Sequence, residues 1–461
     1  MAELPRLVVA GLSGESGKTL VSLALLLEAG RRGIPIRAFK KGPDYIDSAW
    51  LQWASHKPAR NLDTYLMGFD RVADSFASHA VPGGLNLVEG NRGLYDGADA
   101  RGTHSTAELA KALRAPVVLV VNASKVTRTL AALVLGCQRL DPDVRIAGVV
   151  VNQIGSARHE RIVREAIESV CGVPVLGCVP RVTAGVLLPA RHLGLVTPSE
   201  YRHCNLLAQN LLDVTGSHLD FDRIFAISRQ APPVAMPPVP APDPPYGKGV
   251  TIGYLDDSAF SFYYPENLEA LRATGADLVS ISGLTAASLP AGLDALYIGG
   301  GFPETHAQRL SENGGFLASI RAAARRGLPI YAECGGLMYL SSAVTWRGER
   351  FPMVGALSFE VEVRDTPQGH GYAELLVDRP NPFFPVGARL RGHEFHYSKI
   401  LSAGGAPATA CSVLRGTGCW EGRDAVVKDN IWAAYTHLHA LATPEWARAM
   451  VTAARSAAVL A

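Results

Sequence analysis

A proline-rich segment, APPVAMPPVPAPDPP at Ala231–Pro245, divides this chain of 461 residues almost in half. Because proline lacks a backbone N–H and its ring blocks regular pairing, the segment can form neither a helix nor an inner strand. We interpret residues 229–248 as an extended linker. A single hydrophobic core seldom serves a chain this long, so the sequence predicts one domain at residues 1–228 and a second at residues 249–461.

Each half begins with an apolar run, LVVAGL at Leu7–Leu12 and VTIGYL at Val250–Leu255, and further runs alternate with helical stretches. Continuous apolar runs fit strands that are covered on both faces. The predicted fold class is therefore α/β, with two domains that each hold a mainly parallel sheet with helices on both faces. The other runs of the first half are Pro35–Phe39, Leu85–Glu89, Pro116–Asn122, Ile146–Asn152 and Val173–Val179. Those of the second half are Leu278–Ser282, Ala295–Ile298 and Pro329–Ala332, followed by the more mixed segments Ala356–Val363, Tyr372–Val377 and Ala433–His437.

Charge and cysteine content argue against several classes of protein. The formal net charge is +2 and no block of like charges occurs, so nucleic acid is not an expected partner. The first apolar run is too short for a signal peptide or a membrane span, and we expect a cytoplasmic protein without a membrane partner. The seven cysteines form no C-x-x-C pair, which argues against zinc or iron–sulfur ligation. The oligomeric state is left open, a homodimer included.

The segment GLSGESGKT, Gly11 to Thr19, follows a predicted strand and opens a predicted helix. Glycines such as Gly14 and Gly17 let the backbone wrap a phosphate chain, and the helix N-terminus supplies positive potential. Lys18 can then reach the terminal phosphates, and the Thr19 hydroxyl can bind magnesium. The strict P-loop pattern would place glycine at position 12, where this chain has leucine. A glycine-rich turn with an incidental lysine is the alternative, but the strand–loop–helix context favours ATP with Mg²⁺.

Acidic residues follow two later strands of the first half, where ligands bind in open α/β sheets. KKGPDYID carries Asp44 and Asp47 beside Lys40, and VEGNRGLYDG carries Glu89 and Asp96. Each one alone could be a solvated turn residue, but two clusters in one half indicate function, and we take Glu89 and Asp96 as candidate catalytic residues. Glu89 is the best magnesium candidate because an acid at a strand end beside a P-loop usually holds the metal or its water.

The second half contains a candidate nucleophile in YAECGGLMYL. Its apolar strand ends at Cys334, small residues including Gly335 follow, and a helical stretch comes next, which is the layout of a nucleophile elbow. We expect the helix dipole to lower the pKa of the Cys334 thiol. Backbone N–H groups at Gly335 and within Gly299–Gly301, Gly300 and Gly301 above all, could stabilise an oxyanion. A buried structural cysteine is the alternative.

Two histidines in the late predicted strand WAAYTHLHA are candidates for the base that a cysteine nucleophile needs. Alternation along a strand would place His437 and His439 on one face, and we favour His437 as the partner of Cys334. The usual class I amidotransferase has glutamate two residues after this histidine, where this chain has His439. His439 is then either structural or a substitute base. The segment RGHEFHYS lacks a helical zinc spacing and favours an interdomain or substrate-facing strand, and the aromatic residues of SFYYPENL favour the core.

A phosphate-binding half joined to a half with a reactive thiol makes chemical sense as an ATP-dependent, glutamine-hydrolysing amidotransferase. Cys334 would attack the glutamine amide and release ammonia, and water would then clear the thioester. The first half would use ATP to turn a carboxylate into an acyl phosphate, which ammonia can displace.

The motifs GLSGESGKT, FKKGPDYID, EGNRGLYDG, GGGFPE, YAECGGLMYL and RGHEFHYS together resemble the cobyrinic acid a,c-diamide synthases, over essentially the whole chain. The resemblance implies a dethiobiotin synthetase-like ATP domain and a class I glutamine amidotransferase domain that amidate the a and c acetate side chains of a corrin precursor. It implies that Cys334 is the nucleophile, that His437 activates it, and that Asn152 reads the adenine base. It implies further roles in binding ATP, magnesium, phosphate or the tetrapyrrole for Lys18, Thr19, Asp44, Tyr45, Glu89 and Asp96.

Two departures from the family pattern add positive charge, Lys41 in place of an apolar residue and Asn91-Arg92 in place of a more apolar pair. We take Lys41 as a further candidate for binding the acidic substrate. The departures keep open another tetrapyrrole, sirohaem or nickel-sirohydrochlorin. Further alternatives are cobyric acid synthase, a ligase for a small carboxylate, and a non-catalytic P-loop switch fused to an inert amidase-like domain.

Overall fold

The computed structural model describes residues 2–182, 190–191, 194–201, 203–237, 245–401 and 405–460. The chain forms two compact units, Met1–Val239 and Pro240–Ala461. Within the described ranges, no helix is both long and apolar enough to cross a membrane.

A seven-stranded sheet in the order β3-β2-β4-β1-β5-β6-β7 forms the centre of the first unit, and all its pairings are parallel. The central strand β1 lies between β4 and β5, so the order in which strands are added to the sheet reverses there. Open α/β sheets bind ligands at the carboxyl ends of strands at such a switch point. Every apolar run predicted in this half forms a strand. The strands are β1 Arg6–Gly11, β2 Ile36–Lys41, β3 Arg60–Leu62, β4 Leu85–Glu89, β5 Val117–Asn122, β6 Ile146–Ile154 and β7 Val175–Pro180.

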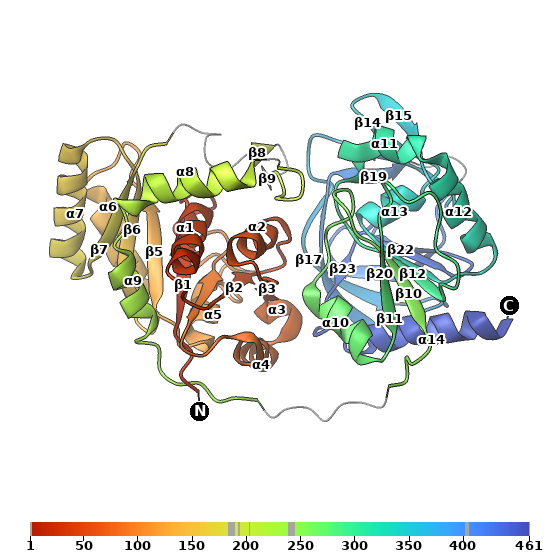
Figure 1. The fold of residues 1–461 in the computed structure, drawn as a ribbon, viewed down its shortest axis with the longest axis horizontal. Helices are drawn as coiled ribbons and strands as arrows, with labels where there is room; N and C mark the ends of the chain where they lie inside the picture. The colour runs from red at the N-terminus through yellow and green to blue at the C-terminus, as the bar shows by residue number, and fades with distance from the viewer. Residues whose placement is uncertain are drawn as a thin grey trace. The chain divides into compact units, whose positions relative to one another are not determined.

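Helices cover this sheet, and Figure 1 shows α1, α2 and α8 side by side. Their apolar faces join the core with strand residues such as Leu7, Val118 and Val150. Several helices begin where a side chain caps the first turn, as Ser105 does for α5 and Ser156 for α7. The helices are α1 Lys18–Arg31, α2 Ile46–Ser55, α3 Thr64–Met67, α4 Phe69–His79, α5 Thr106–Ala112, α6 Thr129–Leu140, α7 Ala157–Cys171, α8 Cys204–Gly216 and α9 Phe221–Ser228, and β8 Ala190–Arg191 pairs with β9 Gly194–Leu195.

The second unit holds a ten-stranded sheet in the order β11-β10-β12-β13-β22-β21-β20-β17-β18-β23. The pairings from β11 to β22 are parallel and those from β22 to β23 are antiparallel. The ten strands are β10 Thr251–Leu255, β11 Asp277–Ile281, β12 Ala295–Ile298, β13 Ile330–Glu333, β17 Gly369–Val377, β18 Arg389–His396, β20 Thr409–Arg415, β21 Arg423–Lys428, β22 Ile431–Ala434 and β23 His437–Leu438. A smaller sheet contains β14 Ala343–Trp346, β15 Glu349–Pro352, β16 Glu360–Val363 and β19 Ser398–Leu401.

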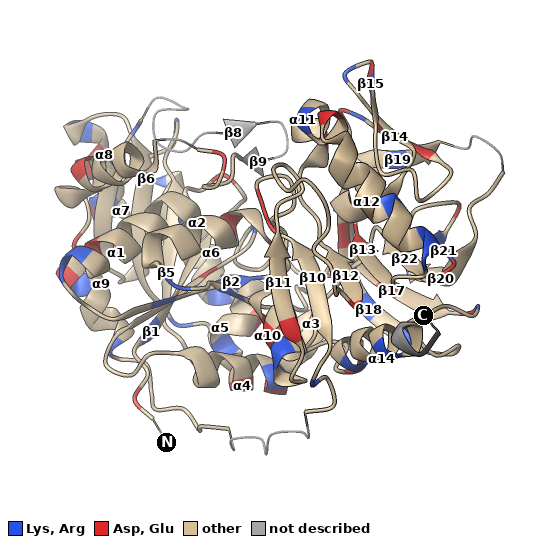
Figure 2. Cartoon of the chain, turned by 45° about the vertical axis from the view of Figure 1, so that its right-hand side comes forward, with Lys and Arg blue, Asp and Glu red and all other residues tan. Residues whose placement is uncertain are grey.

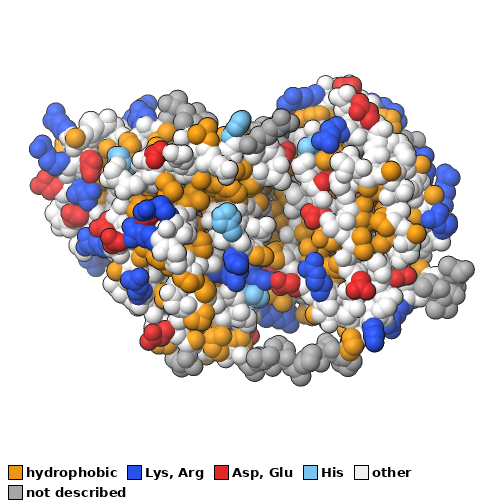
Figure 3. Space-filling view, viewed as in Figure 1, with side chains coloured by type: hydrophobic (Ala, Val, Ile, Leu, Met, Phe, Trp, Pro, Cys, Tyr) orange, Lys and Arg blue, Asp and Glu red, His pale blue; other side chains and the backbone are white. Residues whose placement is uncertain are grey.

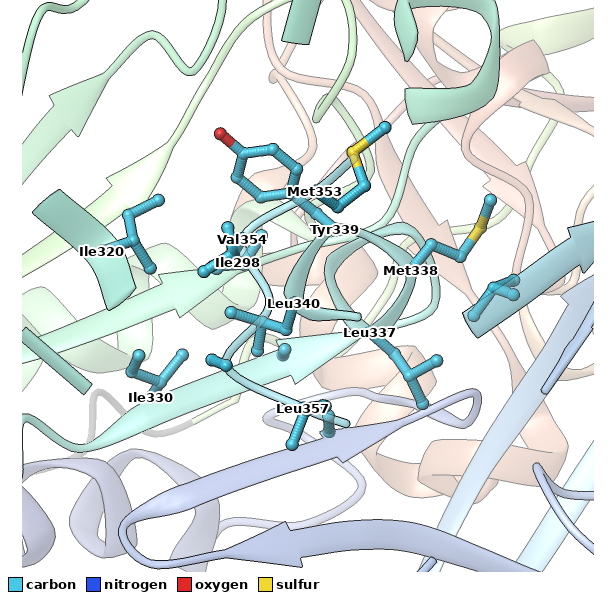
Figure 4. Close-up of a cluster of buried hydrophobic side chains, with 14 of the residues drawn as sticks. Ile298, Ile320, Ile330, Leu337, Met338, Tyr339, Leu340, Met353, Val354 and Leu357 are labelled. Atoms are coloured by element: carbon cyan, nitrogen blue, oxygen red, sulfur yellow. The ribbon is translucent and has the colours of Figure 1, made fainter. Parts of the chain in front are cut away.

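Two hydrophobic clusters cover the two faces of the larger sheet, because neighbouring strand residues such as Tyr297 and Ile298 point to opposite sides. Figure 4 shows part of one cluster, in which Leu337 and Leu340 of α13 lie near Ile298 and Ile330 of the strands. This packing anchors the helix that follows β13. The helices of this unit are α10 Pro265–Ala273, η1 Pro303–His306, α11 Ala307–Glu312, α12 Gly314–Arg325, α13 Gly335–Leu340 and α14 Glu445–Leu460.

The described residues of the proline-rich region are held by the unit that adjoins them. Arg6 Nη2 donates to the Pro232 carbonyl at 2.8 Å, and Ala2 pairs with Val234 in the first unit. On the other side, the Gly247 N–H donates to the Thr274 carbonyl at 2.6 Å. Residues 238–244, the middle of the expected linker, lie outside the described residues.

Charged side chains are distributed over the helices and loops of both units (Figure 2). The face in Figure 3 likewise mixes basic and acidic side chains with apolar ones. This distribution agrees with a formal net charge of only +2.

Candidate functional site

The glycine-rich loop joins the central strand β1 to helix α1, as the sequence predicts. Gly17 has φ 99° and directly precedes the first helical residue, Lys18. A β-carbon at Gly17 would lie 2.2 Å from Asn152 Nδ2, so both the backbone conformation and the space require glycine. Asn152 Nδ2 also donates to the Ser16 carbonyl at 3.1 Å. In this structure Asn152 supports the loop backbone, and its reading of adenine stays a prediction.

Lys18 is buried within the loop. Its Nζ donates to the carbonyl oxygens of Ser13 and Arg92, each at 2.8 Å. Burial, with a further contribution from the charge on Lys40, lowers the pKa of Lys18 to about 8. Burial outweighs the nearby carboxylates of Glu89, Asp47 and Asp96, and a cation held in this way favours an anionic ligand, which agrees with a site for phosphate.

Glu89, at the carboxyl end of β4, connects the loop to the neighbouring strand β2. Its Oε1 accepts hydrogen bonds from Thr19 Oγ1 at 3.0 Å and from Lys40 Nζ at 2.8 Å. Its Oε2 is buried and has no hydrogen-bond partner among the described residues. A buried carboxylate oxygen without a donor, beside a threonine hydroxyl, fits the oxygen ligands that Mg²⁺ requires. Thr19 and Glu89 are therefore suitable residues to hold the metal.

Lys40 also belongs to this site. The sequence showed Lys40 within the motif FKKGPDYID but gave this lysine no role. Its ammonium group contacts Asp47 Oδ2 at 2.6 Å as well as Glu89. Burial alone would lower the pKa of Lys40, but the carboxylates of Asp47 and Glu89 raise it above its ordinary value. The two adjacent lysines in FKKGPDYID hinted at a cation in this site, but the sequence could not show which of them contacts the carboxylates of Asp47 and Glu89.

Asp44 and Tyr45 precede helix α2 at the same end of the sheet. Asp44 Oδ1 accepts the Asp47 N–H at 2.9 Å. Burial and the charge on Asp47 raise the pKa of Asp44 to about 7, from an ordinary value of 3.8. Tyr45 is half-buried at the N-cap position of α2. Asp44 therefore lies near the Lys40–Glu89 pair, and its roles toward metal and substrate stay predictions.

We expect Asp44→Asn to stabilise the fold at neutral and alkaline pH. Because the pKa is raised in the folded state, ionisation of Asp44 costs stability, and this cost grows as the pH rises from about 4 to about 7. The Tm of the variant should exceed that of the native protein by roughly 2 to 4 °C at pH 8, with a smaller difference at pH 5. Thermal denaturation of both proteins checks this, with Asp74→Asn on the exposed side of α4 as the control. Equal Tm values at pH 8 would contradict it.

Three other predicted residues of this unit are Gly14, Asp96 and Lys41. Gly14 is exposed in the loop, and its carbonyl oxygen lies 3.5 Å from Lys18 Nζ. Asp96 is exposed, and its Oδ2 accepts the Gly93 N–H at 2.8 Å, which closes the turn after Arg92. Lys41 is only 5% exposed, and burial lowers its pKa, while Asp63 partly opposes this. Lys41 thus points away from bulk solvent, and its contribution to substrate binding stays a prediction, as does a catalytic role for Asp96.

Cys334 occupies a strained turn between β13 and α13 in the second unit. Its backbone has φ 48° and ψ −99°, which an L-residue adopts only when its surroundings enforce it. A β-carbon at Gly336 would lie 2.4 Å from the Ile298 carbonyl, and one at Gly335 would lie 3.1 Å from the Gly301 nitrogen. The two glycines therefore allow the turn to approach the end of β12. This is the elbow geometry that the sequence predicts.

The predicted lowering of the Cys334 pKa is wrong. Burial raises the pKa of this thiol above its ordinary value, and the carboxylate of Glu304 raises it further, while the Gly335 N–H opposes both. A short helix start adds too little potential to compensate for the loss of hydration. The thiol therefore needs a base that removes its proton.

His437 lies on β23, opposite His393 of β18. A β-carbon at Gly300 would lie 2.5 Å from His437 Cε1 and 3.3 Å from Nε2. The Nε2 edge of the ring thus faces Gly300, and a β-carbon at Gly335, the residue after Cys334, would lie 3.4 Å from the Gly300 carbonyl carbon. The structure brings the predicted nucleophile, base and oxyanion glycines to one place.

The continuous strand predicted over WAAYTHLHA is wrong. β22 ends at Ala434 and the chain turns, because the Asp424 carboxylate accepts the N–H groups of Tyr435 and Thr436, each at 3.0 Å. His439 lies beyond β23, and its Nε2 is 3.6 Å from Glu266 Oε2. His439 thus has its own carboxylate partner.

The predicted oxyanion glycines differ in what their N–H groups contact. The Gly299 N–H donates to the Tyr263 hydroxyl at 2.7 Å, so it is already engaged. Gly301 has φ 155°, and a β-carbon there would lie 2.1 Å from the Ala259 carbonyl. Gly335 opens α13, where the first N–H groups have no acceptor within the helix. Gly300, Gly301 and Gly335 stay the candidates for an oxyanion site.

The remaining motifs lie partly in the interior of this unit, and the substrate-facing or interdomain role of RGHEFHYS stays a prediction, since alternate side chains of its strand are exposed. In RGHEFHYS, predicted to face substrate or the other domain, the side chains of His393, Glu394 and His396 are buried. Glu394 accepts the Gly418 N–H at 2.9 Å, and among the described residues no group of three or more His, Cys, Asp or Glu side chains is arranged to hold a metal ion. Tyr264 of SFYYPENL is buried, as its predicted core role requires.

Comparison with known proteins relates both units to described families. Residues 7–196 match the model of the CobQ/CobB/MinD/ParA nucleotide binding domain, and residues 251–445 match that of the CobB/CobQ-like glutamine amidotransferase domain. The cobyrinate a,c-diamide synthase of Magnetococcus marinus is 42% identical over 449 residues, 96% of each chain. Those of Syntrophotalea carbinolica and Archaeoglobus fulgidus are 42% and 39% identical and cover 97% of this chain, and 98% and 97% of their own. The chain belongs to the cobyrinate a,c-diamide synthase family, and it is a glutamine-dependent amidating ligase with a nucleotide-binding domain.

Proposed function

We propose that this protein uses ATP and glutamine to amidate the a and c acetate carboxylates of cobyrinic acid or hydrogenobyrinic acid. The observation that carries the proposal is that relatives named cobyrinate a,c-diamide synthase match about 40% of the residues over both units. The phosphate loop of one unit and the cysteine elbow of the other support it, because the reaction needs both carboxylate activation and a source of ammonia.

Cys334 and His437 carry out the glutamine half-reaction in this proposal. His437 Nε2 takes the thiol proton, and Cys334 Sγ attacks the glutamine amide carbon to form a tetrahedral oxyanion. The N–H groups near Gly300 and Gly335 stabilise that charge. The C–N bond breaks as the nitrogen takes the proton from His437, and ammonia leaves. Water then hydrolyses the thioester to glutamate and restores the thiol.

The glycine-rich loop with Lys18, together with Thr19 and Glu89, carries out the ligase half-reaction in this proposal. Lys18 and the loop N–H groups bind the phosphates of ATP and position the terminal phosphoryl group for attack by the acceptor carboxylate. The products of this step are an acyl phosphate and ADP. Ammonia then attacks the acyl carbon, and phosphate leaves with the C–O bond electrons. Magnesium, held by Thr19 and Glu89, would neutralise charge on the phosphates.

We expect Glu89→Gln to weaken magnesium use. The substitution removes the charge beside Thr19, so the Mg²⁺ concentration for half-maximal ammonia-dependent synthesis should rise roughly 10-fold or more. A magnesium titration of the synthesis rate measures this, with Glu165→Gln on α7 as a surface control. Glutamine hydrolysis should persist in the variant, which reports that the second unit is folded, and a native Tm should report that the first unit is folded. An unchanged magnesium requirement would remove Glu89 from the metal site.

A panel of acceptors tests the proposed substrate. The purified protein, ATP, Mg²⁺ and glutamine are incubated with cobyrinic acid, hydrogenobyrinic acid, sirohaem and nickel-sirohydrochlorin, and the products are read by mass spectrometry. The proposal predicts two conversions of carboxylate to carboxamide on a corrin acceptor. Conversion of sirohaem or nickel-sirohydrochlorin alone would keep the chemistry and assign another tetrapyrrole.

A further inference from the structure

We propose that Glu333, the residue directly before the nucleophile, is the positioning residue that orients and polarises His437. This inference rests on the proposed glutaminase role of Cys334 and His437. Position 439, where the class I pattern has glutamate, holds a histidine in this chain. The structure offers a carboxylate for the same task from a different strand.

Glu333 is fully buried at the end of β13, and its Oε2 lies 3.4 Å from His437 Nδ1. Burial of a carboxylate costs free energy unless hydrogen-bond donors compensate for the lost hydration, and three donors do so for Glu333. Tyr331 donates to Oε1 and Tyr297 to Oε2, each at 3.2 Å. The Leu438 N–H also donates to Oε1, at 3.1 Å. One carboxylate thus contacts the imidazole ring and holds the backbone of the residue that follows it.

The position of Glu333 decides which nitrogen of His437 can act as the base. A carboxylate facing Nδ1 favours the tautomer with its proton on Nδ1, so Nε2 keeps its lone pair. The Nε2 edge faces Gly300, against which the elbow glycine Gly335 packs. When Nε2 takes the proton of Cys334, the positive charge on the ring lies beside the Glu333 carboxylate. Glu333 thus favours proton transfer from a thiol whose pKa burial has raised.

Glu266 and His439 form a second buried carboxylate–histidine pair. This pair is the alternative to Glu333 and His437 in proton transfer, and it serves as an internal control. Glu266 Oε2 lies 3.6 Å from His439 Nε2, and both side chains are buried. The His439 ring packs against Tyr264, with ring centres 4.4 Å apart. His439 thus contacts α10 and the residue before it, whereas the His437 ring faces Gly300, against which the elbow glycine Gly335 packs. We infer that Glu266 and His439 stabilise the fold and do not take part in proton transfer.

Glu333→Gln tests the inference because glutamine keeps the size of the side chain and removes its charge. Glutamine hydrolysis is measured as kcat and KM, and ammonia-dependent synthesis is measured in parallel. We expect kcat to fall roughly 100-fold or more while the KM for glutamine changes by less than about 3-fold. Ammonia-dependent synthesis should stay at the native rate, since it does not use His437. A purely structural role would instead lower Tm and both activities together.

Three further variants complete the experiment. Glu266→Gln, and Glu394→Gln as a second buried glutamate beside a histidine, should keep kcat within about 3-fold of the native value. Glu333→Asp keeps the charge but moves it away from Nδ1, so its kcat should lie between those of the native protein and Glu333→Gln. If Glu333→Gln folds poorly, a reduced kcat in Glu333→Asp still tests the inference. A native kcat in both Glu333 variants, or an equal loss in Glu266→Gln, would overturn the inference. Absence of glutamine hydrolysis by the native protein would instead overturn the proposed function on which it rests.

Discussion

Replacement of Cys334 by alanine should abolish amidation with glutamine and preserve amidation with ammonium salts. In the proposed mechanism the thiol at the elbow attacks the glutamine amide, and alanine would leave no nucleophile. In the same proposal the ligase half-reaction belongs to the other unit, and it uses ATP with ammonia from either nitrogen source. We expect glutamine-dependent synthesis to fall at least about 1000-fold, with the ammonia-dependent rate within about 2-fold of native. Parallel assays at saturating ATP with either nitrogen source measure both rates.

Cys411→Ala is the matched control for this variant, because Cys411 is also a buried, free thiol of the second unit. It should retain both activities. If Cys334→Ala kept glutamine-dependent synthesis, the elbow would have no catalytic role. If Cys334→Ala lost both activities while its Tm stayed native, the assignment of the two half-reactions to separate sites would be wrong.

Replacement of Lys18 by alanine should abolish synthesis with either nitrogen source. Its ammonium group sits within the loop, at 2.8 Å from the Ser13 carbonyl, where it can neutralise the terminal phosphates of ATP. Loss of this charge should lower the ammonia-dependent rate roughly 1000-fold or more. Release of ADP and formation of the amide, measured together, check this result.

The control for Lys18→Ala is Lys111→Ala, because Lys111 forms its ion pairs with Glu108 and Asp141 away from the loop. The control should keep its synthesis rate. Glutamine hydrolysis in Lys18→Ala should continue if ATP binding does not gate it, and its presence shows that the second unit is folded. Full ammonia-dependent synthesis by Lys18→Ala would remove the loop from the reaction.

Local sequence patterns predicted the parts of the structure that depend on neighbouring residues. The apolar runs of the first half predicted its inner strands, since a parallel strand buried on both faces must be apolar throughout. The loop before Lys18 and the elbow at Cys334 were also recognised, because a small-residue turn between strand and helix is visible in the sequence. The close contacts that a β-carbon would make at Gly17 and Gly336 explain why those turns need glycine.

The features that the sequence did not reveal arise from contacts between distant segments. The thiol pKa of Cys334 depends on burial by several elements, which outweighs the helix dipole. The interruption of the last strand depends on Asp424, a residue of another strand. Lys40 and Glu333 contact side chains from distant parts of the sequence, Glu89 and His437. Nothing in the sequence near Glu333 indicates that a histidine about 100 residues later would lie beside it.

We expect the side-chain amide of glutamine to supply the nitrogen that enters the acceptor carboxylates. Glutamine labelled with ¹⁵N in its side-chain amide, ATP, Mg²⁺ and cobyrinic acid are incubated with the native protein, and the product is analysed by mass spectrometry. The account predicts a diamide that carries ¹⁵N in both new amides, together with ADP and phosphate, and no product without ATP. A diamide without the label, or labelled product formed without ATP, would contradict it.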